Sequence, residues 1–262
     1  MIATGSDTLT FVAFCTSGLE GAVALELRKH NFKVTYSSSG RIFFLGTLQD
    51  IPFLNMKIKS ADRISILIKK FEAATFDELF SNVKNSGLKD FLEPNAKIRI
   101  EKMKITNSRL SATGAVASVL KKAVVEGING TDETGPEYGI ILIIKDDIAY
   151  LLLDTTGENG LNKRGYRIRT GRAPLRETIA ASIIILSKWS ENVELFDPFC
   201  GSGTIPIEAA SLELPNSNRT FSSEKWLILR DTWQEMKKEY DKVWQDYKRK
   251  TVINSLNVKI HH

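Results

Sequence analysis

The run Asp-Pro-Phe-Cys-Gly-Ser-Gly-Thr at residues 197–204 is the feature that most narrowly limits what this chain can fold into. It follows a short apolar stretch, 193–196, which predicts a strand, and it precedes a helical pattern that starts at Ile205. A strand, a glycine-rich turn and a helix start form the first unit of a nucleotide-binding α/β domain. Gly201 and Gly203 have no Cβ, so the backbone there can turn sharply and approach a ligand closely.

The residues of this run discriminate between possible ligands. A phosphate-binding P-loop needs Lys followed by Ser or Thr after its last glycine, where Thr204 and Ile205 stand here. A dinucleotide fingerprint needs a third glycine, which Glu208 and Ala209 do not supply. A zwitterion fits instead, because the helix start can bind a carboxylate and Asp197 can accept from an ammonium. The methionine end of S-adenosylmethionine is such a group; the alternative is a glycine turn in another kind of α/β protein.

Composition places the chain among globular proteins and favours an anionic partner. Its 262 residues suffice for two or three small domains, and a net charge of +5 makes nucleic acid the leading partner. No apolar stretch approaches a membrane span, and the N-terminus does not read as a signal peptide. Cys15 and Cys200 stand in unrelated contexts, so neither a disulfide framework nor a metal site is expected. These features predict a cytoplasmic protein that does not bind a membrane.

Two α/β blocks precede the glycine-rich run. Apolar periodicity in the first block predicts strands at 9–14, 32–36 and 41–45 with helices at 18–30 and 51–58. In the second block it predicts strands at 63–71, 97–104, 139–144 and 148–154 with helices at 76–84 and 114–128. The last two strands flank Lys-Asp-Asp at 145–147, which predicts a hairpin turn.

Three motifs in the second block, taken in order, resemble a THUMP domain, an RNA-binding α/β module of RNA-modifying enzymes. They are Thr-Phe-Asp-Glu-Leu-Phe at 75–80, Ser-Arg-Leu-Ser-Ala-Thr at 108–113, and Asp-Thr-Thr-Gly at 154–157 after an apolar strand. In that family a small ferredoxin-like segment precedes the THUMP domain, and the first block fits that expectation.

The stretch that follows resembles the junction between THUMP and catalytic domains in the rRNA and tRNA guanine-N2 methyltransferases. It reads Leu-Asn-Lys-Arg-Gly-Tyr-Arg at 161–167 and Ala-Pro-Leu-Arg-Glu at 173–177, with Asn162 where the family usually has His. The run 197–204 is similar to the cofactor loop of the amino-methylating class I methyltransferases. The resemblance reaches from the ferredoxin-like start to about residue 244.

The resemblance implies an α/β protein with a ferredoxin-like segment at 1–60, a THUMP domain at 61–156, and a linker plus the first part of a Rossmann-like methyltransferase domain at 157–262. The implied activity is transfer of a methyl group from S-adenosylmethionine to guanine N2 in structured RNA, with rRNA as the first expectation and tRNA as the second. A non-catalytic THUMP protein with a vestigial cofactor loop is the alternative. An amino-methyltransferase acting on DNA is a further one, which the THUMP motifs disfavour.

The resemblance also assigns residues to sites. Those implied to bind S-adenosylmethionine are Pro174, Leu175, Glu177, Asp197, Pro198, Phe199, Gly201, Ser202, Gly203 and Thr204. Candidate RNA contacts are basic residues of the junction and of the 114–128 helix, namely Lys121, Lys122, Lys163, Arg164, Arg167, Arg169 and Arg172. The competing interpretation of these cations is a solvated linker whose arginines pair with nearby acids, and a lysine pair that only adds solubility.

Two parts of the family pattern are missing from the chain. None of its seven prolines is adjacent to another, so the Asn-Pro-Pro-Tyr motif that accepts a hydrogen bond from the target amine is absent. No acid for the cofactor ribose ends the stretch 251–260, which is a candidate second strand. We therefore expect a truncated or split form with no catalytic residue of its own and inactive alone. Its C-terminal third would be either loosely ordered beyond about residue 178 or completed by a second polypeptide. The amphipathic stretch 221–250 and the unpaired strand at 193–196 would offer that partner apolar surface.

Overall fold

A single mixed β-sheet forms the centre of the protein. The computed structural model describes residues 8–167, 174–216 and 219–254. In these residues the sheet has seven strands in the order β2-β3-β1-β4-β7-β6-β5, with β5 and β6 parallel and the other neighbours antiparallel. The strands are β1 (Leu9–Phe14), β2 (Lys33–Ser38), β3 (Arg41–Gly46), β4 (Arg63–Glu72), β5 (Lys97–Thr106), β6 (Glu137–Lys145) and β7 (Ile148–Asp154). Each coincides, within a few residues at its ends, with a strand predicted from the sequence.

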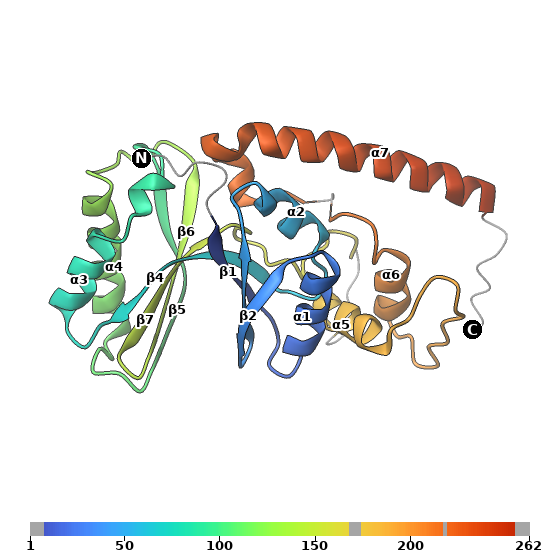
Figure 1. The fold of residues 1–262 in the computed structure, drawn as a ribbon, viewed down its shortest axis with the longest axis horizontal. Coiled ribbons are helices and arrows are strands. Elements are labelled where there is room, and N and C mark those ends of the chain that lie inside the picture. Colours follow the sequence, from blue (N-terminus) through green and yellow to red (C-terminus); the bar gives the residue numbers. More distant parts are fainter. Residues whose placement is uncertain (1–7, 168–173, 217–218, 255–262) are drawn as a thin grey trace.

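The sheet joins the two N-terminal blocks. β1 pairs antiparallel with β4, with Phe11 opposite Ile66, so the strands of the first block continue directly into those of the second (Figure 1). The segments expected at 1–60 and 61–156 therefore share one sheet and one core. The consequence is one continuous platform against which the C-terminal third packs.

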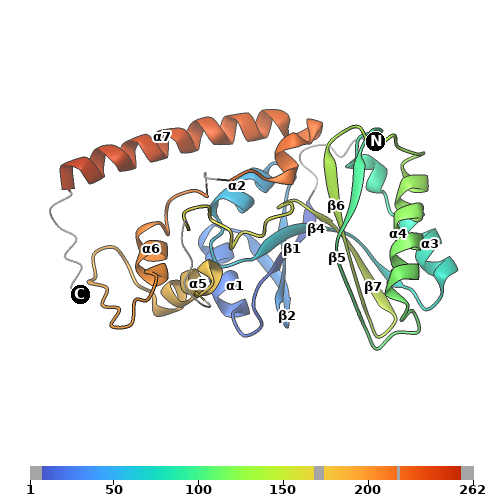
Figure 2. The same ribbon diagram turned by 180° about the vertical axis from the view of Figure 1, so that it is seen from behind.

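Helices of both blocks cover one face of this sheet. They are α1 (Glu20–Lys29), α2 (Asp50–Lys57), α3 (Phe76–Lys84) and α4 (Thr113–Gly127), with a short 3-10 turn, η1 (Leu88–Asp90). Leu27, Leu54, Leu79 and Leu120, one from each helix, belong to the same buried apolar cluster as the strand residues beneath them. Figures 1 and 2 show α3 and α4 at one end of the molecule and α1 and α2 near its middle.

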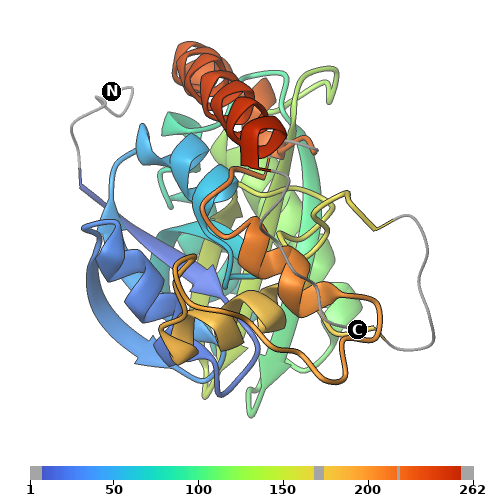
Figure 3. The ribbon, with the colours of Figure 1, turned by 90° about the vertical axis from the view of Figure 1, so that its right-hand side faces the viewer.

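The C-terminal third consists of helices and irregular segments. The helices are α5 (Glu177–Ser187), α6 (Thr204–Ala210) and α7 (Arg230–Asn254), with 3-10 turns η2 (Ser222–Lys225) and η3 (Leu227–Leu229) before α7. Figure 3 shows α5 and α6 next to each other beneath the long helix α7. The predicted amphipathic stretch 221–250 is thus two short turns followed by one long helix. Within the described residues, no helix is long and apolar enough to cross a membrane.

One strand predicted in this third is wrong, and the described part of a second candidate is helical. Residues 193–196 form no strand, and Val193 and Phe196 are exposed. An apolar strand of this kind is stable only between neighbours, and no strand of the described residues lies beside it. Residues 251–254, predicted as the start of another strand, continue helix α7, while 255–260 lie outside the described residues.

Candidate functional site

The loop at 197–204 leads into helix α6 through two glycines. Gly201 has a φ of +54° and Gly203, the N-cap of α6, has a φ of +72°, in the left-handed region where residues with a Cβ are strained. The Gly203 N–H donates to the Cys200 carbonyl at 2.7 Å, which closes the turn. At the start of the loop, the Asp197 carboxylate accepts from the Phe199 N–H at 3.2 Å. The glycine-rich turn before a helix is therefore as the sequence predicts, although no strand precedes it.

The guanidinium of Arg167 brings together residues from both parts of the predicted cofactor site. Its Nε donates to a Glu177 carboxylate oxygen at 2.9 Å, at the first turn of α5. Its terminal nitrogens reach the Leu175 carbonyl at 3.1 Å, the Thr204 hydroxyl at 3.2 Å and the Ser202 hydroxyl at 3.4 Å. The arginine thus links the start of α5 to the loop before α6. The sequence predicted the surrounding residues as one site but predicted Arg167 as an RNA contact. That prediction is not supported, because these bonds engage its guanidinium within the protein.

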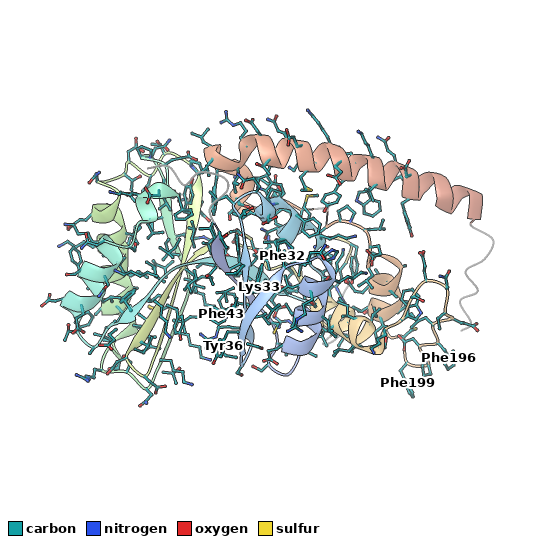
Figure 4. The ribbon with its side chains drawn as sticks, viewed as in Figure 1. Phe32, Lys33, Tyr36, Phe43, Phe196 and Phe199 are labelled. Carbon is teal, nitrogen blue, oxygen red and sulfur yellow. The ribbon has the colours of Figure 1, made fainter. Side chains whose placement is uncertain are left out.

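Other residues predicted for the cofactor, before α5 and on the loop 197–204, are exposed. Pro174, Pro198 and Gly201 are exposed, and Phe199 exposes 92% of its surface. Figure 4 shows Phe196 and Phe199 at the end of the molecule away from α3 and α4. The structure therefore brings the hydroxyl and carboxylate groups of the predicted site together, while its apolar side chains face outward.

Arg164, predicted as an RNA contact, is buried instead. Its residue is 6% exposed, and its guanidinium donates to the Glu208 carboxylate of α6 at 3.2 and 3.4 Å. It also donates to the carbonyls of Leu161 and Lys59. The Tyr166 hydroxyl donates to the same Glu208 at 3.0 Å. The prediction for Arg164 is wrong because these bonds use its guanidinium inside the protein, where the residue holds α6 to the N-terminal blocks.

Beside Arg164, buried polar groups of the first block contact the segment after α6. Glu26 of α1 accepts from the backbone N–H groups of Lys59 and Ser60 at 2.8 and 2.9 Å. The Lys59 ammonium donates to the Asn216 side-chain oxygen at 2.7 Å. Burial lowers the pKa of the Lys59 ammonium to about 7, and the nearby charge of Arg164 acts in the same direction. The first block, the junction and the segment after α6 therefore meet at one polar contact that no local sequence pattern predicts.

This lysine should make the stability of the protein depend on pH. An exposed lysine has a pKa of about 10.4, so between pH about 7 and about 10 the unfolded chain binds a proton at Lys59 that the folded chain releases. The free energy of unfolding is therefore expected to rise with pH across this window, by up to about 1.4 kcal/mol per pH unit. Urea unfolding of the wild type and of Lys59→Met measures it. The variant should lose most of the slope, and an unchanged slope would contradict a titrating Lys59.

Among the remaining candidate RNA contacts, the described ones on α4 lie far from Lys163 of the junction. Lys121 pairs with Glu133 at 2.8 Å, and the Lys122 ammonium lies 5.9 Å from the centre of the Phe80 ring. Both belong to α4, at the end of the molecule far from α5 and α6 (Figure 1). Lys163 is exposed beside the junction. Arg169 and Arg172 lie outside the described residues.

The cysteines and other potential metal ligands of the described residues form no cluster. The described residues contain no group of three His, Cys, Asp or Glu side chains placed to hold a metal ion. Cys15 and Cys200 are free cysteines, the second of them exposed within the loop. Burial raises the pKa of the Cys15 thiol to about 12, so it is protonated at neutral pH.

Three family profiles match consecutive parts of the chain. The RlmL ferredoxin-like domain matches residues 10–65, the THUMP domain matches 73–154, and the RMKL-like methyltransferase domain matches 164–256. These matches confirm the predicted fold class, in which a ferredoxin-like segment and a THUMP domain precede a methyltransferase segment. The chain thus carries a THUMP domain followed by a segment that matches a methyltransferase domain.

Several relatives that are similar to most of this chain have names. The YpsC protein of Bacillus subtilis is 36% identical over 244 residues, which cover 88% of this chain and 63% of that protein. Ribosomal RNA large subunit methyltransferase K/L of Magnetococcus marinus is 33% identical over 82% of this chain and 32% of its own length. The tRNA (guanine(6)-N2)-methyltransferase of Methanocaldococcus jannaschii is 30% identical over 75% of this chain and 54% of its own length.

A solved structure has a similar fold over most of this chain. The crystal structure of SMU.472, complexed with SAH, matches with a TM-score of 0.83 at 34% identity, and covers 90% of this chain and 65% of that one. The chain is thus similar, over most of its length, to proteins named as RNA methyltransferases. It spans less than two thirds of the length of each of these relatives.

Proposed function

We propose that this chain serves the methylation of guanine N2 in structured RNA, with S-adenosylmethionine as methyl donor, and acts in the cytoplasm. Ribosomal RNA is the first candidate substrate and tRNA the second. The observation that carries the proposal is the convergence of Glu177, Ser202 and Thr204 on Arg167, at a glycine-rich helix start that follows a THUMP domain. The proposal is also supported by sequence identities of 33% and 30% to an rRNA and a tRNA methyltransferase over most of the chain.

The cofactor would bind along the loop and the start of α5. Asp197 would accept from its ammonium, and the N–H groups around Gly201 and Gly203 would face its carboxylate. Pro174, Leu175, Glu177, Pro198, Phe199, Ser202 and Thr204 complete the proposed cofactor-binding residues. S-adenosylmethionine supplies an electrophilic methyl group to the guanine amine. The chain's part is to hold and orient that donor.

We also propose that a polypeptide carrying the rest of the methyltransferase fold packs on the apolar side chains of this third. Phe196 and Phe199 on the loop are exposed, as are Ile183 and Leu186 on α5. A monomeric protein rarely leaves so many large apolar side chains uncovered in one region. The same polypeptide would bring the acceptor for the amine, which the Asn-Pro-Pro-Tyr motif provides in the family.

Two measurements test this function. Isothermal titration with S-adenosylhomocysteine should show binding that Asp197→Ala weakens at least tenfold, while Asp231→Ala on exposed α7 leaves it unchanged. With labelled S-adenosylmethionine and RNA from a methylase-deficient strain, the 262-residue chain alone should incorporate no methyl group. The corresponding C-terminal third of the Bacillus relative, added as a second polypeptide, should restore incorporation. Robust incorporation by the chain alone would contradict the need for a further polypeptide. If S-adenosylhomocysteine bound neither the chain alone nor the chain with the second polypeptide, the non-catalytic THUMP protein would be favoured.

A further inference from the structure

The face of the sheet opposite the helices carries an apolar cluster made by strands. Its buried members are Val12, Phe14, Phe43, Ile141, Ile143 and Leu152. Side chains of α1 to α4 belong instead to the cluster on the other face. Because the pleat alternates, every strand of the sheet presents a second set of side chains on this helix-free face.

This face is concave. Lys102 on the edge strand β5 places its ammonium 5.4 Å from the centre of the Phe14 ring on β1, although β4, β7 and β6 lie between the two strands. The Phe43 ring on β3 lies 6.2 Å from the Tyr150 ring on β7, across β1 and β4. Contacts that skip intervening strands require the sheet to curl around this face, which therefore forms a trough.

Cations line the trough above the aromatic rings. The Lys70 ammonium and the Arg41 guanidinium lie 5.4 and 5.6 Å from the Tyr150 ring centre. Partial burial, with the nearby charges of Arg63 and Lys104, lowers the pKa of the Lys102 ammonium below its ordinary value. In the described part of the chain, neither Arg41, Lys70 nor Lys102 forms an ion pair with a carboxylate.

Two carboxylates next to these cations, Glu101 and Asp154, are already paired with arginine. Arg63 pairs with Glu101 and with Asp154, both at 2.7 Å, at one end of the trough. Glu101 also pairs with Arg99. These two acids therefore do not neutralise Arg41, Lys70 and Lys102, which lie next to the aromatic rings.

An exposed aromatic ring completes the surface. Tyr36 on β2 is 62% exposed, and its ring lies 5.7 Å from that of Phe43. Figure 4 shows Tyr36 and Phe43 close together, between the two halves of the sheet. An exposed ring on the same face as cations that form no ion pair within the described residues suits a ligand that has both planar groups and phosphates.

We propose that this concave face, lined by Tyr36, Arg41, Phe43, Lys70, Lys102 and Tyr150, binds a single-stranded segment of RNA. The proposal rests on the proposed function and locates its RNA contact on the sheet, away from the lysines of α4. The cations bind phosphates and Tyr36 stacks on an unpaired base. A duplex does not offer such a base, because its bases are stacked inside the helix.

The test measures the affinity of the full chain for labelled oligonucleotides by fluorescence anisotropy at several salt concentrations. The probes are a single-stranded RNA of about 12 nucleotides, the same RNA as a duplex, and the DNA of the same sequence. The sheet-face variants are Tyr36→Ala, Tyr36→Phe and the double variant Lys70→Gln/Lys102→Gln. The matched control, Lys121→Gln/Lys122→Gln, removes the same charge from α4.

We expect Tyr36→Ala to weaken binding of single-stranded RNA about tenfold, and Tyr36→Phe to keep most of the affinity because the ring remains. The sheet-face double variant should reduce the slope of log K against log salt by about 1.4, from about 0.7 per phosphate contact. The α4 double variant should leave the slope unchanged. Circular dichroism confirms that each variant is folded.

Three results would overturn the assignment. Loss of affinity in the α4 variant but not in the sheet-face variants would place RNA on α4 and leave the proposed function standing. Tighter binding of the duplex than of the single strand, or of DNA than of RNA, would exclude single-stranded RNA as the ligand of this face. If the wild-type chain bound none of the probes, both this inference and an RNA substrate would fail.

Discussion

Replacing Arg164 with methionine is expected to lower the free energy of unfolding by about 3–5 kcal/mol, since it leaves a buried carboxylate without its cation. Glu208 is fully buried and accepts from Arg164 at 3.2 and 3.4 Å, with the Tyr166 hydroxyl as its other donor. The same arginine donates to the carbonyls of Leu161 and Lys59. Urea unfolding followed by circular dichroism measures the effect.

Two variants control this experiment. Lys163→Met changes the neighbouring exposed cation and should shift stability by no more than about 0.5 kcal/mol. The double variant Arg164→Met/Glu208→Met removes both charges and should recover most of the loss, because apolar side chains of similar size often replace a buried ion pair without penalty. If Arg164→Met cost no more than Lys163→Met, the buried pair would not hold the junction together.

The N-terminal two thirds could be predicted from the sequence because its signals are local. Thr75 and Glu78 form a capping box, with each side chain bonded to the other's backbone N–H, and α3 begins where that motif predicts. Asp146 and Asp147 adopt φ values of 52° and 58°, as a tight hairpin turn requires. Apolar alternation then fixes which face of each strand meets the helices.

The wrong strand at 193–196 has a different cause. Its apolar residues fit a strand covered on both faces, but such a strand forms only when neighbouring strands satisfy its backbone. That requirement depends on partners distant in sequence, which periodicity does not report. Without neighbouring strands the apolar side chains of 193–196 are exposed, and for this reason we propose a partner for this region.

Arg164 shows the same limit for single residues. In a run rich in Lys and Arg, a cation is usually solvated, and the sequence therefore predicted an RNA contact. Its burial depends on Glu208 in α6 and on the first block, both remote in sequence. One sequence signal pointed to this pair. Glu208 stands among apolar residues, and a carboxylate buried there needs a cationic partner. The candidate cofactor residues were easier to group, since two short motifs contain them.

Trp226 is the second residue whose replacement should have a large effect. It is fully buried, and its ring stacks on Tyr138 of β6 with centroids 4.8 Å apart and an interplanar angle of 20°. Three residues before Trp226, in η2, the Ser223 hydroxyl donates to the Thr155 carbonyl at 2.8 Å. These contacts anchor the segment before α7 to the second block, so the position of α7 depends on them.

Trp226→Ala is expected to cost about 3–5 kcal/mol, the usual range for removing a buried aromatic side chain. Denaturant unfolding measures the loss, and amide exchange should show lower protection across η2 and the start of α7 while β1 to β4 keep theirs. Leu227→Ala, at the next position and 54% exposed, is the matched control and should be nearly neutral. Trp226→Phe should cost much less than the alanine change, since it keeps a stacked ring and removes an indole N–H that is buried without a partner. Equal losses for the phenylalanine and alanine variants would mean that the size of the indole, and not its stacking on Tyr138, anchors this segment.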